Sequence, residues 1–91
     1  MGGNWNITKE KGEEIIITIF REIIKIKPKT TINFLCKGMS KFAKYNNIIL
    51  LKNGKVRNLN TYMKDVYGGI YKFISKNSSY FYIDNNYIFS Y

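Results

Sequence analysis

The sequence contains no histidine, one cysteine, one proline and only six acidic residues among its 91 residues. Histidine is the commonest general base and metal ligand, so its absence argues against most acid–base and metal-dependent chemistry. The sequence also contains no zinc-ligand spacing, no phosphate-loop motif and no dinucleotide-binding fingerprint. We therefore expect a protein that is not an enzyme, has no cofactor and binds no metal.

The single cysteine, Cys36, has no partner for an internal disulfide. This favours a reducing, intracellular compartment such as the cytoplasm, the nucleus or an organelle matrix. Cys36 follows Leu35 on an expected helix, and we interpret it as a packed thiol rather than a nucleophile.

Long apolar runs are also missing, since no stretch approaches the roughly 20 residues that span a bilayer. The N-terminal segment has no apolar core of the kind that signal peptides carry, so we expect neither a signal peptide nor a membrane span. Hydrophobic residues make up 45% of the chain, which is enough for one compact domain. We place an N-terminal tail at residues 1–8 and a single domain at residues 9–91.

Acidic residues are scarce in one part of the chain. Residues 1–22 hold three cations against four acids, whereas residues 23–91 hold twelve cations against two acids. A basic surface of this kind attracts a polyanion such as nucleic acid. Codon usage in an AT-rich genome would explain part of the lysine excess, but it does not explain the missing aspartates.

The first half of the chain predicts two helices. Residues 9–26 carry apolar side chains at helical spacing, with Thr8 as the N-cap and Pro28 as the stop. The β-branched run at residues 15–19 leaves a buried strand as the alternative. Residues 31–45 predict the second helix, capped by Thr30 or Thr31.

The second half predicts two hairpins and a third helix. Asn53-Gly54 predicts a hairpin or ordered loop within residues 47–57. Residues 58–76 predict a helix that can break at Gly68-Gly69, and residues 79–90 predict a terminal hairpin. Three helices followed by a β-hairpin form the layout of a winged helix-turn-helix, so we expect an α+β fold of this type.

Residues 67–74 read YGGIYKFI and residues 80–83 read YFYI. This stretch resembles the end of RNA-associated winged-helix domains of the Egalitarian and LOTUS (OST-HTH) type, and the match covers about residues 58–89. The resemblance implies that the glycines let the third helix approach the first closely. It further implies RNA binding or docking in an RNA–protein complex. The chain departs from the family at residues 78–79, where the family often has proline, and at its Asn53-Gly54 segment.

The expected nucleic-acid-binding residues lie on the third helix and on the segment before it. They are Lys52, Lys55, Arg57, Asn58, Asn60, Lys64, Lys72 and Lys76. Tyr71, Tyr80 and Tyr82 are candidates for stacking on unpaired bases. The alternatives are a solvated helix face for the first set and packing within the domain for the tyrosines.

The sequence thus predicts a small basic nucleic-acid-binding module, for RNA rather than DNA. One alternative is a non-catalytic structural subunit of a larger RNA–protein complex such as an organellar ribosome, with protein neighbours as partners. A second alternative is a DNA-binding transcriptional regulator that recognises half-sites as a dimer.

Overall fold

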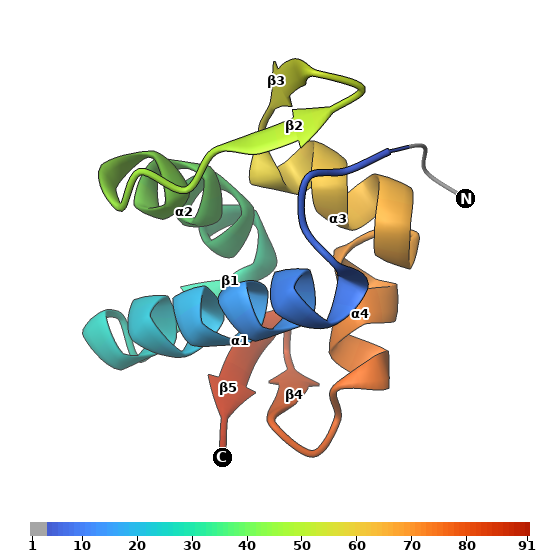
Figure 1. Ribbon diagram of the computed structural model, residues 1–91. Helices are drawn as coiled ribbons and strands as arrows, with labels where there is room; N and C mark the ends of the chain where they lie inside the picture. Colours follow the sequence, from blue (N-terminus) through green and yellow to red (C-terminus); the bar gives the residue numbers. More distant parts are fainter. Residues whose placement is uncertain (1–3) are drawn as a thin grey trace.

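Four helices and two small antiparallel sheets make up residues 4–91, the part of the chain that the computed structural model describes (Figure 1). The elements in chain order are α1 (Lys9–Ile26), β1 (Thr30–Thr31), α2 (Ile32–Tyr45), β2 (Leu50–Lys52), β3 (Lys55–Arg57), α3 (Leu59–Tyr67), α4 (Ile70–Lys76), β4 (Phe81–Asp84) and β5 (Tyr87–Ser90). The expected α+β class is confirmed.

The segment 9–26 is helical throughout, so the strand alternative for residues 15–19 is wrong. The Thr8 hydroxyl accepts a hydrogen bond from the Lys11 amide at 3.1 Å and caps the helix as predicted. The predicted apolar stripe is buried in full: Ile16, Ile19, Phe20, Ile23 and Ile24. Burial of this stripe outweighs the strand preference of the isoleucines because it joins α1 to the rest of the core.

The strand β1 was not predicted. Its two residues, Thr30 and Thr31, pair antiparallel with Ile88 and Tyr87 of β5. The Thr30 side chain is fully buried and its hydroxyl donates a hydrogen bond to the Lys27 carbonyl. A strand of two residues is too short to show a periodic pattern, so the sequence alone does not predict it. It forms through pairing with β5, at the other end of the chain.

Both hairpins turn through two residues with positive φ. Asn53 and Gly54 have φ of 52° and 80°, and Asn85 and Asn86 have φ of 51° and 66°. Two such residues form the type I′ turn that matches the twist of antiparallel strands. Both predicted hairpins are confirmed, as β2–β3 and β4–β5.

The predicted third helix breaks at Gly68-Gly69 into α3 and α4, with φ of 86° and 115° at the two glycines. The expectation that these glycines permit close helix packing is wrong. A Cβ at Gly69 would meet nothing, and one at Gly68 would meet only the Lys72 side chain. Both glycines serve the left-handed backbone instead.

The close approach occurs at Gly12 on α1. A Cβ there would collide with the phenol of Tyr62, a core residue on α3 that is 1% exposed. The Tyr62 ring in turn packs edge-on against Trp5, with ring centroids 4.9 Å apart. Gly12 therefore sets the distance between α1 and α3.

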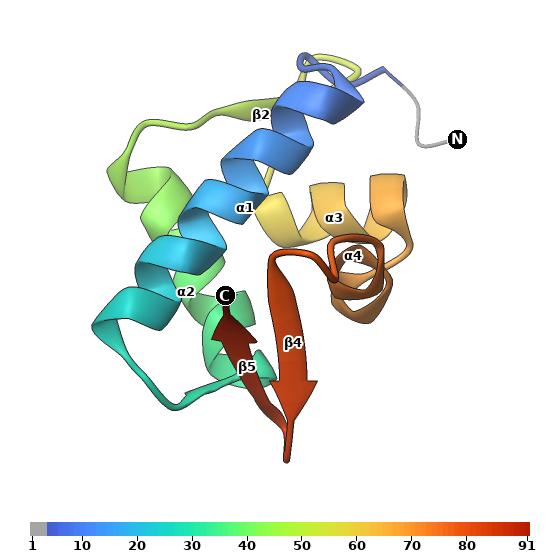
Figure 2. The same cartoon turned by 90° about the horizontal axis from the view of Figure 1, so that it is seen from below.

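Phe20 lies at the centre of the core and joins α1 to the C-terminal half of the chain. Its ring centroid lies 5.6 Å from those of Phe73 on α4 and Phe81 on β4, in edge-on geometry. Phe73 and Phe81 are 0% and 1% exposed and fill the core beside it. The sheet β1-β5-β4 consequently has α1 against one of its faces (Figures 1 and 2).

The segment 4–8 runs beside the hairpin β2–β3 rather than away from the domain. Trp5 forms a bridge with Lys52, and the Asn6 amide donates to the Leu51 carbonyl at 3.0 Å. Ile7 packs against the core. These residues extend the domain beyond the expected boundary at residue 9.

We predict that Gly12→Ala lowers the free energy of unfolding by about 1–2 kcal/mol, because overpacking against Tyr62 exceeds the gain in helix propensity. Urea denaturation followed by Trp5 fluorescence measures this change. Gly38→Ala is the matched control, since its Cβ would meet the flexible end of Ile23 at 3.2 Å. Equal stability of the two variants would show that the contact does not limit α1–α3 packing.

Candidate nucleic-acid interface

Lys52, one of the expected phosphate contacts, is engaged within the fold. Its ammonium Nζ lies 2.9 Å from Asp65 Oδ2 and 5.8 Å from the centre of the Trp5 ring. The Trp5 indole N–H donates to the same Asp65 oxygen at 2.9 Å. These two hydrogen bonds hold the pKa of Asp65 below its ordinary value of 3.8, and the one from Lys52 has the larger effect. This cluster ties β2 and the N-terminal segment to α3.

The two expected asparagines are also engaged. Asn60 Nδ2 donates to the Cys36 carbonyl and to Ser40 Oγ, each at 2.9 Å, and so joins α3 to α2. Asn58 Oδ1 accepts from the Thr61 amide at 2.8 Å and caps α3. Each of the two carboxamides therefore makes at least one hydrogen bond within the fold.

Lys76 lies at the end of α4 and turns toward α1. Its Nζ lies 3.6 Å from Glu13 Oε2 and 5.6 Å from the centre of the Tyr67 ring. The side chain is half exposed, so the pair is weak and open to solvent.

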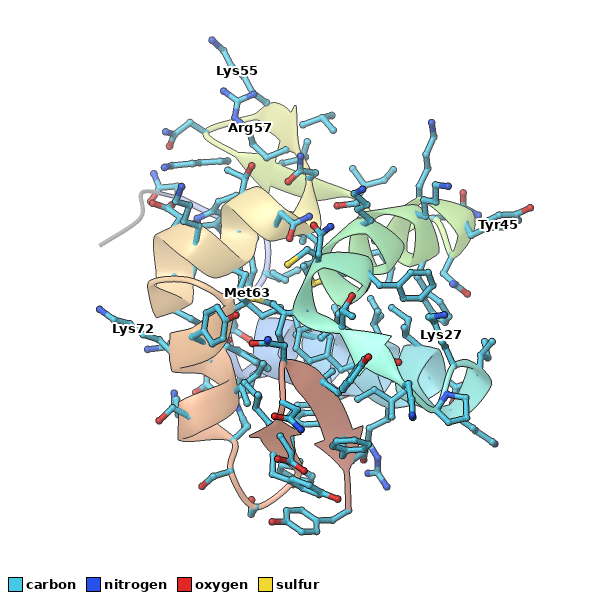
Figure 3. The ribbon with its side chains drawn as sticks, turned by 180° about the vertical axis from the view of Figure 1, so that it is seen from behind. Lys27, Tyr45, Lys55, Arg57, Met63 and Lys72 are labelled. Atoms are coloured by element: carbon cyan, nitrogen blue, oxygen red, sulfur yellow. The ribbon has the colours of Figure 1, made fainter. Side chains whose placement is uncertain are left out.

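Four expected cations are exposed and form no ion pair within the described chain: Lys55, Arg57, Lys64 and Lys72. Figure 3 shows Lys55 and Arg57 projecting from the β2–β3 hairpin and Lys72 projecting from the outer side of α4. Lys72 therefore lies apart from the hairpin cations.

Three further lysines on α2 were not among the expected residues. Lys37, Lys41 and Lys44 are spaced about one helical turn apart and are all exposed. Their places off the apolar stripe were visible in the sequence. Of the three, Lys44 lies beside the hairpin residues Val56 and Arg57, and this depends on the packing of α2 and α3, which the sequence did not show.

A groove of about 480 Å³ lies between the C-terminal end of α2 and the hairpin. Lys44 and Arg57 are on its lining, together with the exposed apolar side chains of Ile49 and Val56. We call the exposed cations of α2, the β2–β3 hairpin and α3 the helix–hairpin surface; its members are Lys37, Lys41, Lys44, Lys55, Arg57 and Lys64.

The pairing of charges leaves this surface strongly basic. In residues 4–91 the ion pairs are Lys11–Glu14, Lys52–Asp65 and Lys76–Glu13. Ten of the twelve cations after residue 22 therefore have no ionic partner in the described chain, and all ten are exposed. Electrostatic repulsion among them is relieved by a bound polyanion.

The three candidate stacking tyrosines lie in two places. Tyr71 is 60% exposed on α4, whereas Tyr80 and Tyr82 are 43% and 42% exposed beside and on β4. Tyr82 has ring neighbours on β5, and Tyr71 has none in the described part of the chain. Tyr80 packs beside the adjacent Phe81, with ring centroids 6.3 Å apart. The structure therefore does not bring the three tyrosines into one cluster.

Residues 4–91 contain no group of three or more His, Cys, Asp or Glu side chains able to hold a metal ion. Cys36 is partly buried, and burial raises the pKa of its thiol, so it is protonated near neutral pH. None of the helices described here is long and apolar enough to cross a bilayer.

Compared with protein-family models, curated proteins and solved structures, the chain shows no match. The resemblance of residues 58–89 to LOTUS-type domains therefore stays a prediction from the residues themselves.

We predict that Asp65→Asn destabilises the fold at neutral pH, because it removes the ionic partner of Lys52. Because its pKa is lowered in the folded state, Asp65 stabilises the fold above pH 3.8. This stabilisation is lost as the pH falls through the pKa that Asp65 has in the folded state. Urea midpoints of the wild type and the variant should therefore differ at pH 7 and draw closer as the pH falls below 3.8.

Asp84→Asn is the control, since Asp84 is exposed at a hairpin turn and forms no ion pair in the described chain. A difference between wild type and Asp65→Asn that stays constant between pH 7 and pH 3 would contradict the electrostatic explanation.

Proposed function

We propose that the chain is a winged-helix module that binds nucleic acid through the helix–hairpin surface. The observation that carries the proposal is that six of the ten exposed cations without ionic partners after residue 22 belong to this surface. Side chains of this kind contact phosphates and release counterions on binding. Lys52, Asn58 and Asn60 make contacts within the fold and so help to position the elements that carry this surface.

The order of the elements supports the winged-helix assignment. The helices α2 and α3 would form the helix-turn-helix, with the β2–β3 hairpin inserted between them, and β4–β5 would form the wing. The short strand β1 between α1 and α2 pairs with β5 and attaches the wing to the helices.

RNA is the favoured ligand, because the stretch at residues 67–74 and 80–83 resembles RNA-associated domains.

Exposed apolar side chains favour a second function, that of a structural subunit in an RNA–protein complex. Tyr45, Ile49 and Val56 are 90%, 60% and 69% exposed beside the helix–hairpin cations. A protein neighbour would cover them while RNA contacts the lysines.

The direct test is a titration of the chain with single- and double-stranded RNA and DNA at two salt concentrations. We expect binding at low salt that weakens steeply as salt rises. Absence of binding to all four ligands at low salt would contradict the proposal.

We predict that Lys44→Gln/Arg57→Gln weakens duplex binding and lowers the slope of log affinity against log salt by close to 2, about 0.9 for each lost phosphate contact. Arg21→Gln/Lys25→Gln is the matched control. It removes the same charge from a hollow on α1 that shares no lining residue with the groove of Lys44 and Arg57. An equal loss in both variants would indicate that net charge, rather than the helix–hairpin surface, governs binding.

A further inference from the structure

The sheet β1-β5-β4 has one face packed on the core and one face toward solvent. Phe81 and Ile88 point inward and are 1% and 0% exposed. Because side chains alternate along a strand, their neighbours point outward. The register pairs Tyr82 with Phe89 on this outer face, and Asp84 with Tyr87. Within residues 4–91, α1 packs against the inner face, and no helix covers the outer one (Figure 2).

The outer face carries an unusual set of side chains. The solvent side of an antiparallel sheet is ordinarily polar, whereas this one carries four aromatic rings. We call it the aromatic sheet face; its members are Tyr82, Tyr87, Phe89 and Tyr91.

Three of these rings form a continuous group. The centroids of Tyr82 and Phe89 lie 5.1 Å apart at an interplanar angle of 23°, which is a stacked arrangement. Tyr91 lies 5.0 Å from Tyr82 and is 74% exposed. Flat rings held by a sheet lose little conformational entropy when a planar ligand stacks on them.

The charges around the face favour an anionic ligand. Lys27 and Lys29 come just before β1 in the chain, and β1 is the edge strand that pairs with β5 at Thr30 and Ile88, so this basic segment leads into one edge of the sheet. The Lys27 ammonium lies 5.1 Å from the centre of the Phe34 ring on α2. Lys27 and Lys29 are both exposed and without an ionic partner in the described chain. The acid on this face, Asp84, lies at the hairpin turn, away from Tyr91. Aromatic planes beside cations suit bases joined to phosphates.

We propose that the aromatic sheet face stacks the unpaired bases of a single-stranded nucleic acid, with the phosphates along the edge that carries Lys27 and Lys29. This inference rests on the proposed nucleic-acid function and adds a second surface to it. Bases inside a duplex cannot reach such a face, because their planes are already stacked on one another. The face therefore selects single strands and tolerates different base sequences.

The test compares a fluorescently labelled oligouridine of about 12 nucleotides, within the range of known single-strand sites, with a duplex of the same length. Tyr82→Leu/Phe89→Leu removes the two stacked rings and keeps apolar side chains on the strands. We expect its affinity for the single strand to fall at least about tenfold, since each stacked base contributes substantially to binding. Its affinity for the duplex should stay at the wild-type value.

Tyr45→Leu is the matched control, because Tyr45 is 90% exposed and lies at the end of α2, apart from the sheet. It should bind both ligands as the wild type does, and circular dichroism should show that both variants are folded. An unchanged affinity of Tyr82→Leu/Phe89→Leu for oligouridine would overturn the stacking proposal while leaving the helix–hairpin proposal intact. Failure of the wild type to bind either ligand would overturn both.

Discussion

The burial of Phe20 between Phe73 and Phe81 is the contact on which the rest of the structure depends. It joins α1 to the last helix and to the terminal hairpin, so that elements about 60 residues apart share one core. Because α1 lies against one face of the β1-β5-β4 sheet, the opposite face is left to solvent. The exposure of the aromatic rings on that face is thus a consequence of how the core is closed, since a strand must place alternate side chains outside.

The same core decides which charges are neutralised. Lys52 reaches Asp65 because β2 lies beside α3, and Lys76 reaches Glu13 because α4 packs beside α1. The remaining cations of α2 and the hairpin face solvent without an acid in reach. A protein of this size gains little stability from exposed ion pairs, so the fold tolerates the imbalance. Its chief effect is on what the surface attracts.

Local signals in the sequence predicted most of the elements, because caps and turns act within a few residues. Thr8 and the two-residue turns are examples, and each appears where it was expected. Long-range contacts could not be predicted. The strand β1 exists only through its pairing with β5, and the contact of Gly12 with Tyr62 joins positions 50 residues apart. For the same reason Lys52 was expected to bind phosphate, since nothing near it in sequence pointed to its pairing with Asp65.

The central claim is that a polyanion neutralises the cations of α2, the β2–β3 hairpin and α3. The most direct measurement is a nuclear magnetic resonance titration of the ¹⁵N-labelled chain with RNA at low salt, read residue by residue. The account predicts chemical-shift changes concentrated at Lys37, Lys41, Lys44, Arg57 and their neighbours, and their loss at high salt. Changes confined to the exposed side of α1, or no changes at all, would contradict it.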